Sequence, residues 1–336
     1  NTLGVVWRSQ LWEFPAEFDE EETRILSFNK LRGVGKKGWI GIRELSTDRY
    51  PKIFPSIRNY FPDGLKNSRG EEVKDFLEEF TVKTLDGNKI CSMWLHVPGH
   101  EHRCYTPCSS NPAFREYLHY EIRQMVKAGT AGVFLDECST AHHALCNSGC
   151  FCPDCMRGFR GYLKKKGVSL PEGQDPETFD YGDYLRGLGY HDEDLNSAQK
   201  ELRLEIPLFR EFICFMNDQD DILTEDLIEY AHACGKEAGR EIIVAGNLYD
   251  FQPKYAGVRK NLDFLGGEMN VDLRNDEFYQ LARAFADGKK GFFTQDYSPH
   301  VLDIIDDIKH GKNDTYTLML FEALAFGSMI SVPYGS

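Results

Sequence analysis

The sequence lacks several features that would point to common protein classes. No apolar run is long enough to cross a bilayer, which argues against a membrane-spanning protein. Basic residues are in deficit, since 39 Lys and Arg stand against 53 Asp and Glu, and the net charge of −14 offers no attraction to nucleic acid. No glycine-rich phosphate loop follows an early strand pattern, which disfavours a nucleotide-binding sheet. No repeat, low-complexity tract or linker divides the chain, so we expect residues 1–336 to form a single domain.

The chain begins at Asn1, and no signal peptide is visible in it, although a leader removed from a precursor would leave no trace. Ten cysteines occur in a chain large enough to fold without disulfides, and five of them fall between Cys138 and Cys155. Short spacers of this kind favour metal binding and a reducing compartment over a disulfide framework. We therefore expect a cytoplasmic protein.

Short apolar runs that end in polar residues recur along the whole chain. Runs of this length are typical of strands buried on both faces of a parallel sheet. The expected strands are 39–45, 90–97, 131–137, 241–250, 262–270, 291–298 and 327–335, with an eighth at 3–7. Apolar residues at helical spacing separate them, and the expected helices are 113–129, 155–167, 207–235, 276–288 and 316–327.

This alternation of strands and helices predicts an α/β fold of the (β/α)₈ TIM-barrel class with long loops. An open doubly wound sheet is the alternative fold. The polar segment 168–205 is predicted to be a helical insertion over one end of the barrel.

The stretch "CNSGCFCPDC" (146–155) places four cysteines within ten residues. Spacings of two and three between Cys150, Cys152 and Cys155 let one loop supply three sulfur ligands to an ion. Zn²⁺ takes four ligands in a tetrahedron, and an all-thiolate site has no open position, so the ion would be structural. The residues alone leave the fourth ligand open among Cys104, Cys108, Cys138 and Cys146, with His142 or His143 as substitutes.

The cysteine-rich stretch also carries a resemblance to a known family. "CFCPDCMRGFRGYL" (150–163) resembles the stretch of the glycoside hydrolase family-42 β-galactosidases in which Cys-x-Cys-x-x-Cys precedes a helix, and "CSSNPAFREY" (108–117) is similar to a second stretch of that family. The resemblance covers residues 104–166 and is shared by other barrel hydrolases. It implies that Cys108 joins Cys150, Cys152 and Cys155 around a structural zinc ion.

Four carboxylates end predicted strands, where the chemistry of a barrel collects. They are Asp136, Glu137, Glu268 and Asp296. The resemblance implies Glu137 as acid/base and Asp296 as nucleophile. However, Asp136 replaces a family Asn and Asp296 replaces a family Glu. The competing pair is Asp136 as nucleophile with Glu268 as acid/base, as in barrels that use strands four and six.

Two facing carboxyl groups are the machinery of glycoside cleavage, and their separation distinguishes retaining from inverting enzymes. The sequence therefore predicts a glycoside hydrolase that cleaves an oligo- or polysaccharide, with a retaining mechanism expected and a homo-oligomer possible. Aromatic rings and polar groups near strand ends are predicted to bind the carbohydrate. These residues are Trp94, His96, Asn247, Tyr249, Asn270 and Tyr297.

Two other functions fit the same residues. In "HVPGHEHRC" (96–104), His96, His100 and His102 could join Asp136 or Asp296 in a metal-dependent hydrolase with an open coordination position. The third hypothesis is a barrel that binds carbohydrate without cleaving it. Chelation would abolish the activity of a metal-dependent hydrolase without unfolding it, which distinguishes it from a two-carboxylate enzyme. Substitution of the carboxylates would leave the ligand affinity of a carbohydrate-binding barrel intact, with no turnover to lose.

Overall fold

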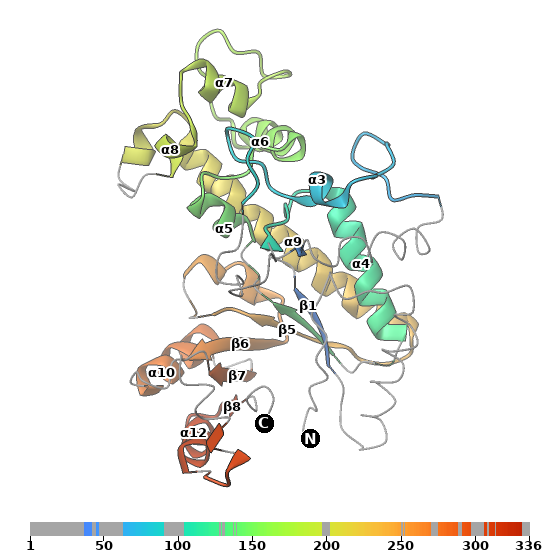
Figure 1. Cartoon of the computed structure of the whole chain (residues 1–336), viewed down its shortest axis with the longest axis vertical. Coiled ribbons are helices and arrows are strands. Elements are labelled where there is room, and N and C mark those ends of the chain that lie inside the picture. The colour runs from blue at the N-terminus through green and yellow to red at the C-terminus, as the bar shows by residue number, and fades with distance from the viewer. Residues whose placement is uncertain are drawn as a thin grey trace.

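A computed structural model describes the chain at residues 37–41, 45–46, 63–90, 104–127, 129, 132–136, 138, 140–196, 202–249, 251, 253–269, 275–287, 291–296, 306–307, 309–312 and 314–330. The strands form the lower half of the molecule in Figure 1, and a helical region lies above them. Within these ranges, no helix combines the length and apolar character needed to cross a bilayer.

Six parallel strands form the main sheet, in the order β1-β4-β5-β6-β7-β8. Every neighbouring pair is parallel, as the continuous apolar runs predict. The strands are β1 (Lys37–Gly41), β4 (Gly132–Asp136), β5 (Ile243–Asn247), β6 (Phe264–Met269), β7 (Gly291–Asp296) and β8 (Met329–Ile330). A separate antiparallel pair consists of β2 (Leu45–Ser46) and β3 (Cys104–Tyr105).

The α/β class and the parallel pairing of the sheet therefore match the sequence prediction. The prediction was wrong in detail for 39–45, because the parallel strand covers Lys37–Gly41 and Leu45 pairs elsewhere. The expected strands 3–7 and 90–97 lie outside the described residues. Within the described sheet β1 and β8 are the outer strands, so the sheet is open there.

Helices separate the strands along the chain. They are α3 (Phe76–Phe80), α4 (Pro112–Lys127), α5 (Thr140–Cys146), α6 (Pro153–Lys166), α7 (Tyr181–Gly187), α8 (Asp192–Leu195), α9 (Phe209–Glu237), α10 (Asn275–Phe285) and α12 (Asp314–Ala325), with 3₁₀ turns at Leu202–Glu205, Pro253–Tyr255 and Val258–Lys260.

The start of α4 follows the sequence rules for helix capping. The Asn111 side chain accepts a 2.8 Å hydrogen bond from the Phe114 amide, and Pro112 occupies the first helical position. Phe114, Leu118 and Ile122 recur on one face and are fully buried. This face joins α4 to the core beside the sheet.

Two large hydrophobic cores and one small cluster lie among the described residues, and the long helix α9 takes part in both large cores. Its first half contributes Phe212 and Phe215 to a helical core built with α5, α6 and α7, whereas its second half contributes Leu227 and Ala231 to the core of the sheet. In Figure 1, α9 runs from the helical region down to the strands. The helix therefore connects the two cores rigidly.

Aromatic rings fill the helical core. The Phe159 ring of α6 lies 5.0 Å from the Tyr181 ring and 5.2 Å from the Phe212 ring, between centroids. The Tyr181 hydroxyl donates to the Pro207 carbonyl at 2.7 Å, which satisfies its polar end. Four buried residues of the segment predicted as an insertion thus pack in one core with α5, α6 and α9, and they are Phe179, Tyr181, Leu185 and Leu195.

Candidate active site and metal centre

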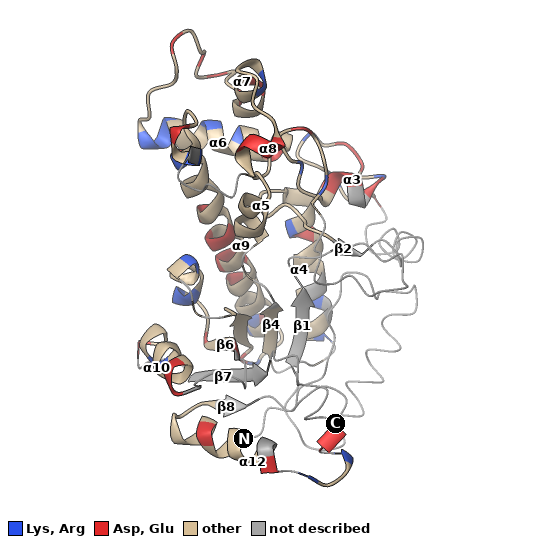
Figure 2. Ribbon diagram, turned by 60° about the vertical axis from the view of Figure 1, so that its left-hand side comes forward, with Lys and Arg blue, Asp and Glu red and all other residues tan. Residues whose placement is uncertain are grey.

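Polar residues gather at the carboxyl edge of the sheet. Strand β4 ends at Asp136, β5 ends at Asn247, and Glu268 is the penultimate residue of β6. The arrows of β1 and β4 point toward the helical region (Figure 2), so this edge faces the helical core. In parallel α/β sheets, ligand sites form at this edge.

A hydrogen bond joins the ends of β5 and β6 through side chains. The Asn247 amide donates from Nδ2 to Oε1 of Glu268 at 2.5 Å. The Asn247 Oδ1 accepts from the Tyr249 backbone N–H at 2.9 Å, and the Glu268 N–H donates to the Tyr249 carbonyl at 2.7 Å. Asn247 is 3 % exposed, Glu268 is half-buried and Tyr249 is exposed. The carboxyl group is thus held at the surface by a buried amide.

The turn after β5 needs unusual backbone geometry to make these contacts. Tyr249 and Phe251 have φ values of 48° and 56°, in the left-handed region that non-glycine residues rarely adopt. The turn brings the Phe251 ring onto Gly267 of β6. A Cβ atom at Gly267 would lie 2.4 Å from Cε2 of Phe251, so only glycine allows this packing.

The register of the strands relates the predicted carboxylates to one another. Leu135 pairs with Gly246, which puts Asp136 and Asn247 at the next step of the β4–β5 ladder. Glu268 pairs with Gln295, and Asp296 pairs one residue later with Met269. Because successive residues of a strand alternate between faces, the position of Asp296 belongs to the opposite face of the sheet from that of Glu268.

Other predicted site residues lie outside the described part of the chain. These are Glu137, Trp94, His96, Asn270 and Tyr297, together with His100 and His102.

Cys138, two residues after the end of β4, contacts both β4 and β5. Its thiol is buried, donates to the Leu135 carbonyl at 3.4 Å, and lies where a Cβ at Gly246 would approach Sγ to 3.2 Å. The turn therefore packs closely on β5, beside Asn247. Cys138 is not part of the cysteine cluster described next.

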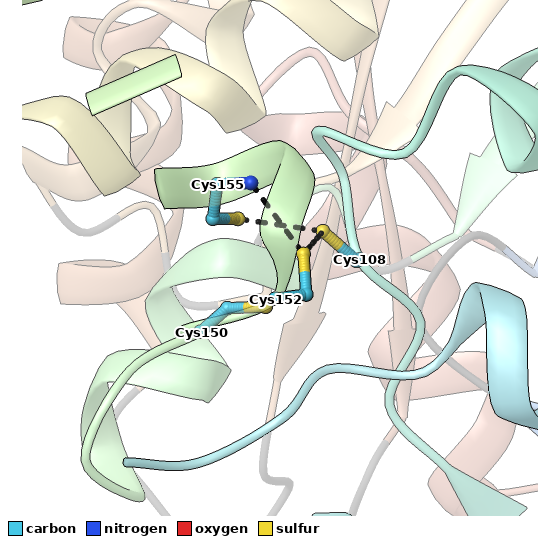
Figure 3. A group of neighbouring side chains, drawn as sticks. All are labelled: Cys108, Cys150, Cys152 and Cys155. Carbon is cyan, nitrogen blue, oxygen red and sulfur yellow. Dashed lines mark hydrogen bonds between the residues drawn. The ribbon is translucent and has the colours of Figure 1, made fainter. Parts of the chain in front are cut away.

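The structure brings together Cys108, Cys150, Cys152 and Cys155, all buried, with their four sulfur atoms within 4.8 Å of one another. Figure 3 shows Cys108 reaching the other three from a separate segment. The Cys108 sulfur lies 3.5 Å from the sulfur atoms of Cys152 and Cys155. Four sulfur ligands at about 2.3 Å from a tetrahedral zinc ion would be about 3.8 Å apart. The donor set and spacing therefore fit a metal such as zinc.

Local structure explains why the cluster forms at this point. Cys152 is the N-cap of α6, its sulfur accepts from the Cys155 amide at 3.5 Å, and Pro153 starts the helix. The Cys108 amide donates to the Phe80 carbonyl at 2.7 Å, which fixes the second segment. A helix N-terminus favours nearby negative charge, as thiolate ligands require.

The buried thiols influence one another's protonation. Burial alone opposes ionisation of Cys150, but hydrogen bonds from Cys108, Cys152 and Cys155 lower the pKa of Cys150 well below its usual value. The hydrogen bond with Cys150 and those with the other two thiols raise the pKa of Cys108. A bound metal ion would deprotonate all its thiol ligands.

Alternative ligands considered from the sequence are occupied elsewhere. His143 Nδ1 lies 2.9 Å from the Thr106 hydroxyl, and His142 Nε2 lies 3.8 Å from the exposed Cys146 sulfur. Neither histidine belongs to the cluster found among the described residues.

The contacts of two buried polar residues near these sites, Asp220 and Asn111, were not predicted from the sequence. The Asp220 carboxylate of α9 accepts from the Ala141 and His142 amides at 2.7 and 3.0 Å, which caps α5. Asn111 donates to the buried Asp154 at 3.2 Å, beside the cysteine cluster. Their signal is a polar residue within an apolar helix pattern, and the sequence does not reveal its partner.

Comparisons with known proteins identify related sequences. No family model matches the chain. Over 202 residues, or 57 % of the chain, it is 26 % identical to an α-agarase of Alteromonas agarilytica, and over 201 residues it is 26 % identical to an α-agarase of Thalassotalea agarivorans. The matched region is 14 % of the length of each of these enzymes.

Solved glycoside hydrolase structures also align with the chain. The glycoside hydrolase domain of PelA from Pseudomonas aeruginosa aligns at a TM-score of 0.44 and 9 % identity, covering 98 % of this chain and 92 % of the other. Aspergillus fumigatus Ega3, in complex with galactosamine, aligns at 0.37 and 11 % identity, covering 82 % and 65 %.

Proposed function

We propose that this chain is a glycoside hydrolase that cleaves a polysaccharide, with agarose as the first substrate to test. The similarity to α-agarases over 57 % of the chain supports the reaction class. The observation that carries the proposal is the hydrogen-bonded pair of Asn247 and Glu268 at the carboxyl edge of the sheet, with Asp136 ending the strand next to β5.

The catalytic carboxylates in this proposal are Asp136 and Glu268. The β5 strand lies between β4 and β6, so these two strands are about 9.6 Å apart at two strand spacings, and Glu268 lies two residues along β6 beyond Gly266, the partner of Asn247. We propose that both carboxyl groups reach a substrate bound across this edge, at the separation of a glycosidase pair, which is about 5–5.5 Å for retaining and 6.5–9.5 Å for inverting enzymes. We assign the retaining mechanism.

In this mechanism Glu268 donates its proton to the glycosidic oxygen while an Asp136 oxygen attacks the anomeric carbon. The carbon–oxygen bond breaks, and its electron pair leaves with the released alcohol. Glu268, now a carboxylate, then takes a proton from water, and that water attacks the anomeric carbon and releases Asp136. The register sets Asp296 out of phase with Glu268, so Asp296 belongs to a second candidate pair, with Glu137, which is the pair implied by the family-42 resemblance.

Substrate contacts in the proposal begin with Tyr249. This residue is 40 % exposed and lies two residues after Asn247, the end of β5, and its backbone carbonyl accepts a hydrogen bond from the Glu268 backbone N–H. An exposed ring in this position can stack on a sugar face. Asn270, Tyr297, Trp94 and His96 remain predicted sugar contacts from the sequence.

The proposal also includes a closed barrel and a structural zinc ion. Closure would place further strands between the outer strands β1 and β8, and the runs 3–7 and 90–97 have the required apolar character. The four-cysteine cluster would hold zinc with no open position, so the ion would stabilise the helical core without taking part in hydrolysis.

The test uses agarose and a panel of aryl glycosides, with purified wild-type protein and the variants Asp136→Asn and Glu268→Gln. Matched controls are Glu137→Gln and Asp296→Asn. We expect the first two variants to lose about 10²-fold or more of kcat on poor leaving groups and the controls to lose far less. Azide should rescue Asp136→Gly and yield a glycosyl azide of inverted configuration, which marks the nucleophile.

Other outcomes would overturn the proposal. If both Asp136→Asn and Glu268→Gln keep full activity, the carboxylate assignment is wrong. Loss of activity on chelation without loss of folding would instead support a metal-dependent hydrolase. Saturable binding of agarose without turnover would support a carbohydrate-binding barrel.

A further inference from the structure

We propose that Asn247 is a positioning residue that determines which oxygen of Glu268 carries the catalytic proton. This inference rests on the proposed function, because it assigns Glu268 as the acid/base. It adds a residue whose effect is exerted through the Glu268 carboxyl group and not through contact with the sugar.

The orientation of the Asn247 amide follows from its two partners. The Tyr249 backbone N–H can only donate, so the Asn247 atom 2.9 Å away must be the acceptor Oδ1. The NH₂ group then faces Glu268, where Nδ2 lies 2.5 Å from Oε1. Rotating the amide by 180° would oppose two donors at Tyr249 and two acceptors at Glu268 unless Glu268 were protonated on Oε1. The donor clash at the backbone disfavours this orientation in every protonation state.

The backbone keeps this arrangement in place. The Glu268 N–H donates to the Tyr249 carbonyl at 2.7 Å, and the Leu248 N–H donates to the Gly266 carbonyl at 2.8 Å. These two backbone hydrogen bonds therefore hold the end of β5 against β6 beside the side-chain contact between Asn247 and Glu268. Asn247 is 3 % exposed, so water competes little for its amide. The amide and the carboxyl group consequently move as one unit.

The consequence concerns the proton. Because Nδ2 can only donate, Oε1 of Glu268 is an acceptor whether the group is a carboxylate or a carboxylic acid. The carbonyl oxygen of a carboxylic acid is a better acceptor than its hydroxyl oxygen, so this hydrogen bond favours the proton of Glu268 on Oε2. That oxygen donates to the glycosidic oxygen in the first step and receives the proton from water in the second. A fixed proton position raises the fraction of bound complexes in which the acid is oriented for proton transfer, and a higher fraction increases the rate.

The test compares Asn247→Asp and Asn247→Ala with Glu268→Gln, using aryl glycosides whose leaving groups range from dinitrophenol to phenol. Asn247→Asp retains an acceptor for the Tyr249 amide but cannot donate to Glu268. We expect a roughly tenfold or greater loss of kcat for phenol and little loss for dinitrophenol, because only the poor leaving group needs the proton. The ionisation that limits activity should shift to higher pH in Asn247→Asp, since two facing carboxyl groups share a proton.

Asn261→Asp is a matched control. The Asn261 amide donates to Glu225 at 3.0 Å in a similar Asn–Glu pair on an exposed surface, and this variant should leave both the leaving-group dependence and the pH profile unchanged. Thermal unfolding of each variant checks that it folds. Neutron diffraction of the wild-type protein provides a measurement that needs no variant, and we expect deuterium on Oε2 when Glu268 is protonated.

The outcomes separate this inference from the proposed function. If Glu268→Gln shows no dependence on the leaving group, Glu268 is not the acid and the proposed function fails at this point. If Glu268→Gln shows the dependence but Asn247→Asp lowers all rates equally, with an unshifted pH profile, only the positioning role is refuted. Deuterium on Oε1 would also refute it.

Discussion

If the four-cysteine cluster holds zinc as proposed, removal of that ion is the perturbation with the largest expected effect on stability. The four sulfur atoms lie within 4.8 Å of one another, and the Cys108 sulfur lies 3.5 Å from those of Cys152 and Cys155. Zinc needs spacings of about 3.8 Å, so each sulfur has to move by less than about 1 Å. The site is therefore nearly preformed, and little of the binding energy is spent on reorganisation.

The free energy of zinc binding can be compared with the free energy of unfolding of the whole protein. Structural zinc in small peptides contributes about 10–16 kcal/mol of apparent binding energy, whereas entire domains are stable by about 5–15 kcal/mol. Aromatic packing around Phe159 and Tyr181 remains after the ion leaves, so the loss should be partial. We expect a loss of about 5 kcal/mol or more, which lowers Tm by about 10 °C or more for a chain of this size.

The assay combines metal analysis with thermal unfolding. Protein purified without chelator should contain one zinc ion per chain by mass spectrometry, and dialysis against a strong chelator should remove the ion and lower Tm. Cys152→Ser should show the same low Tm without chelator, whereas Cys214→Ser, at an exposed cysteine outside the cluster, should match the wild type. A metal-free protein with the Tm of the untreated sample would refute the structural role of the cluster.

Two further predictions concern single contacts. Gly267→Ala should reduce stability by about 1–3 kcal/mol in denaturant unfolding and also reduce activity, because the new Cβ displaces the Phe251 ring; unchanged values would contradict the packing argument. A hydrogen bond to Asp86 raises the pKa of exposed His191 above 6.5, so this contact stabilises the protein at low pH and is lost as the pH rises through the raised value. NMR titration of His191 should give a midpoint above 6.5 that falls in Asp86→Asn, and an equal midpoint in the two proteins would contradict the pairing.

Sequence patterns predicted the long elements of this fold well. The helix expected at 207–235 is α9 at Phe209–Glu237, and the strand expected at 291–298 is β7 at Gly291–Asp296. Both have strong apolar periodicity and clear ends, so local rules suffice. The second core was harder to predict, because nothing in the sequence indicates that the two halves of α9 bury their apolar faces against different partners.

The pairing of Asn247 with Glu268 was also beyond sequence reasoning. Each residue was placed at a strand end, but their contact depends on the β5–β6 register and on a left-handed turn at Tyr249. Left-handed turns are usually predicted from glycine or asparagine, and a tyrosine gives no such signal. The contact is therefore a property of the tertiary structure that a motif search would miss.

The packing around β4 suggests why a metal centre and a catalytic edge occur in one chain. Asp136 ends β4, and the chain then enters α5, whose N-terminus is capped by Asp220 of α9 and whose other end leads into the cysteine loop. The same α9 continues into the core of the sheet and precedes β5, where Cys138 packs on Gly246. A carboxylate must be held to within about 0.5 Å to act on a sugar, and the segment that follows Asp136 is fixed by a buried cap and a buried thiol. Neither this cap nor this thiol belongs to the four-cysteine cluster, so loss of a bound ion should lower Tm and leave kcat nearly unchanged at temperatures well below the unfolding transition.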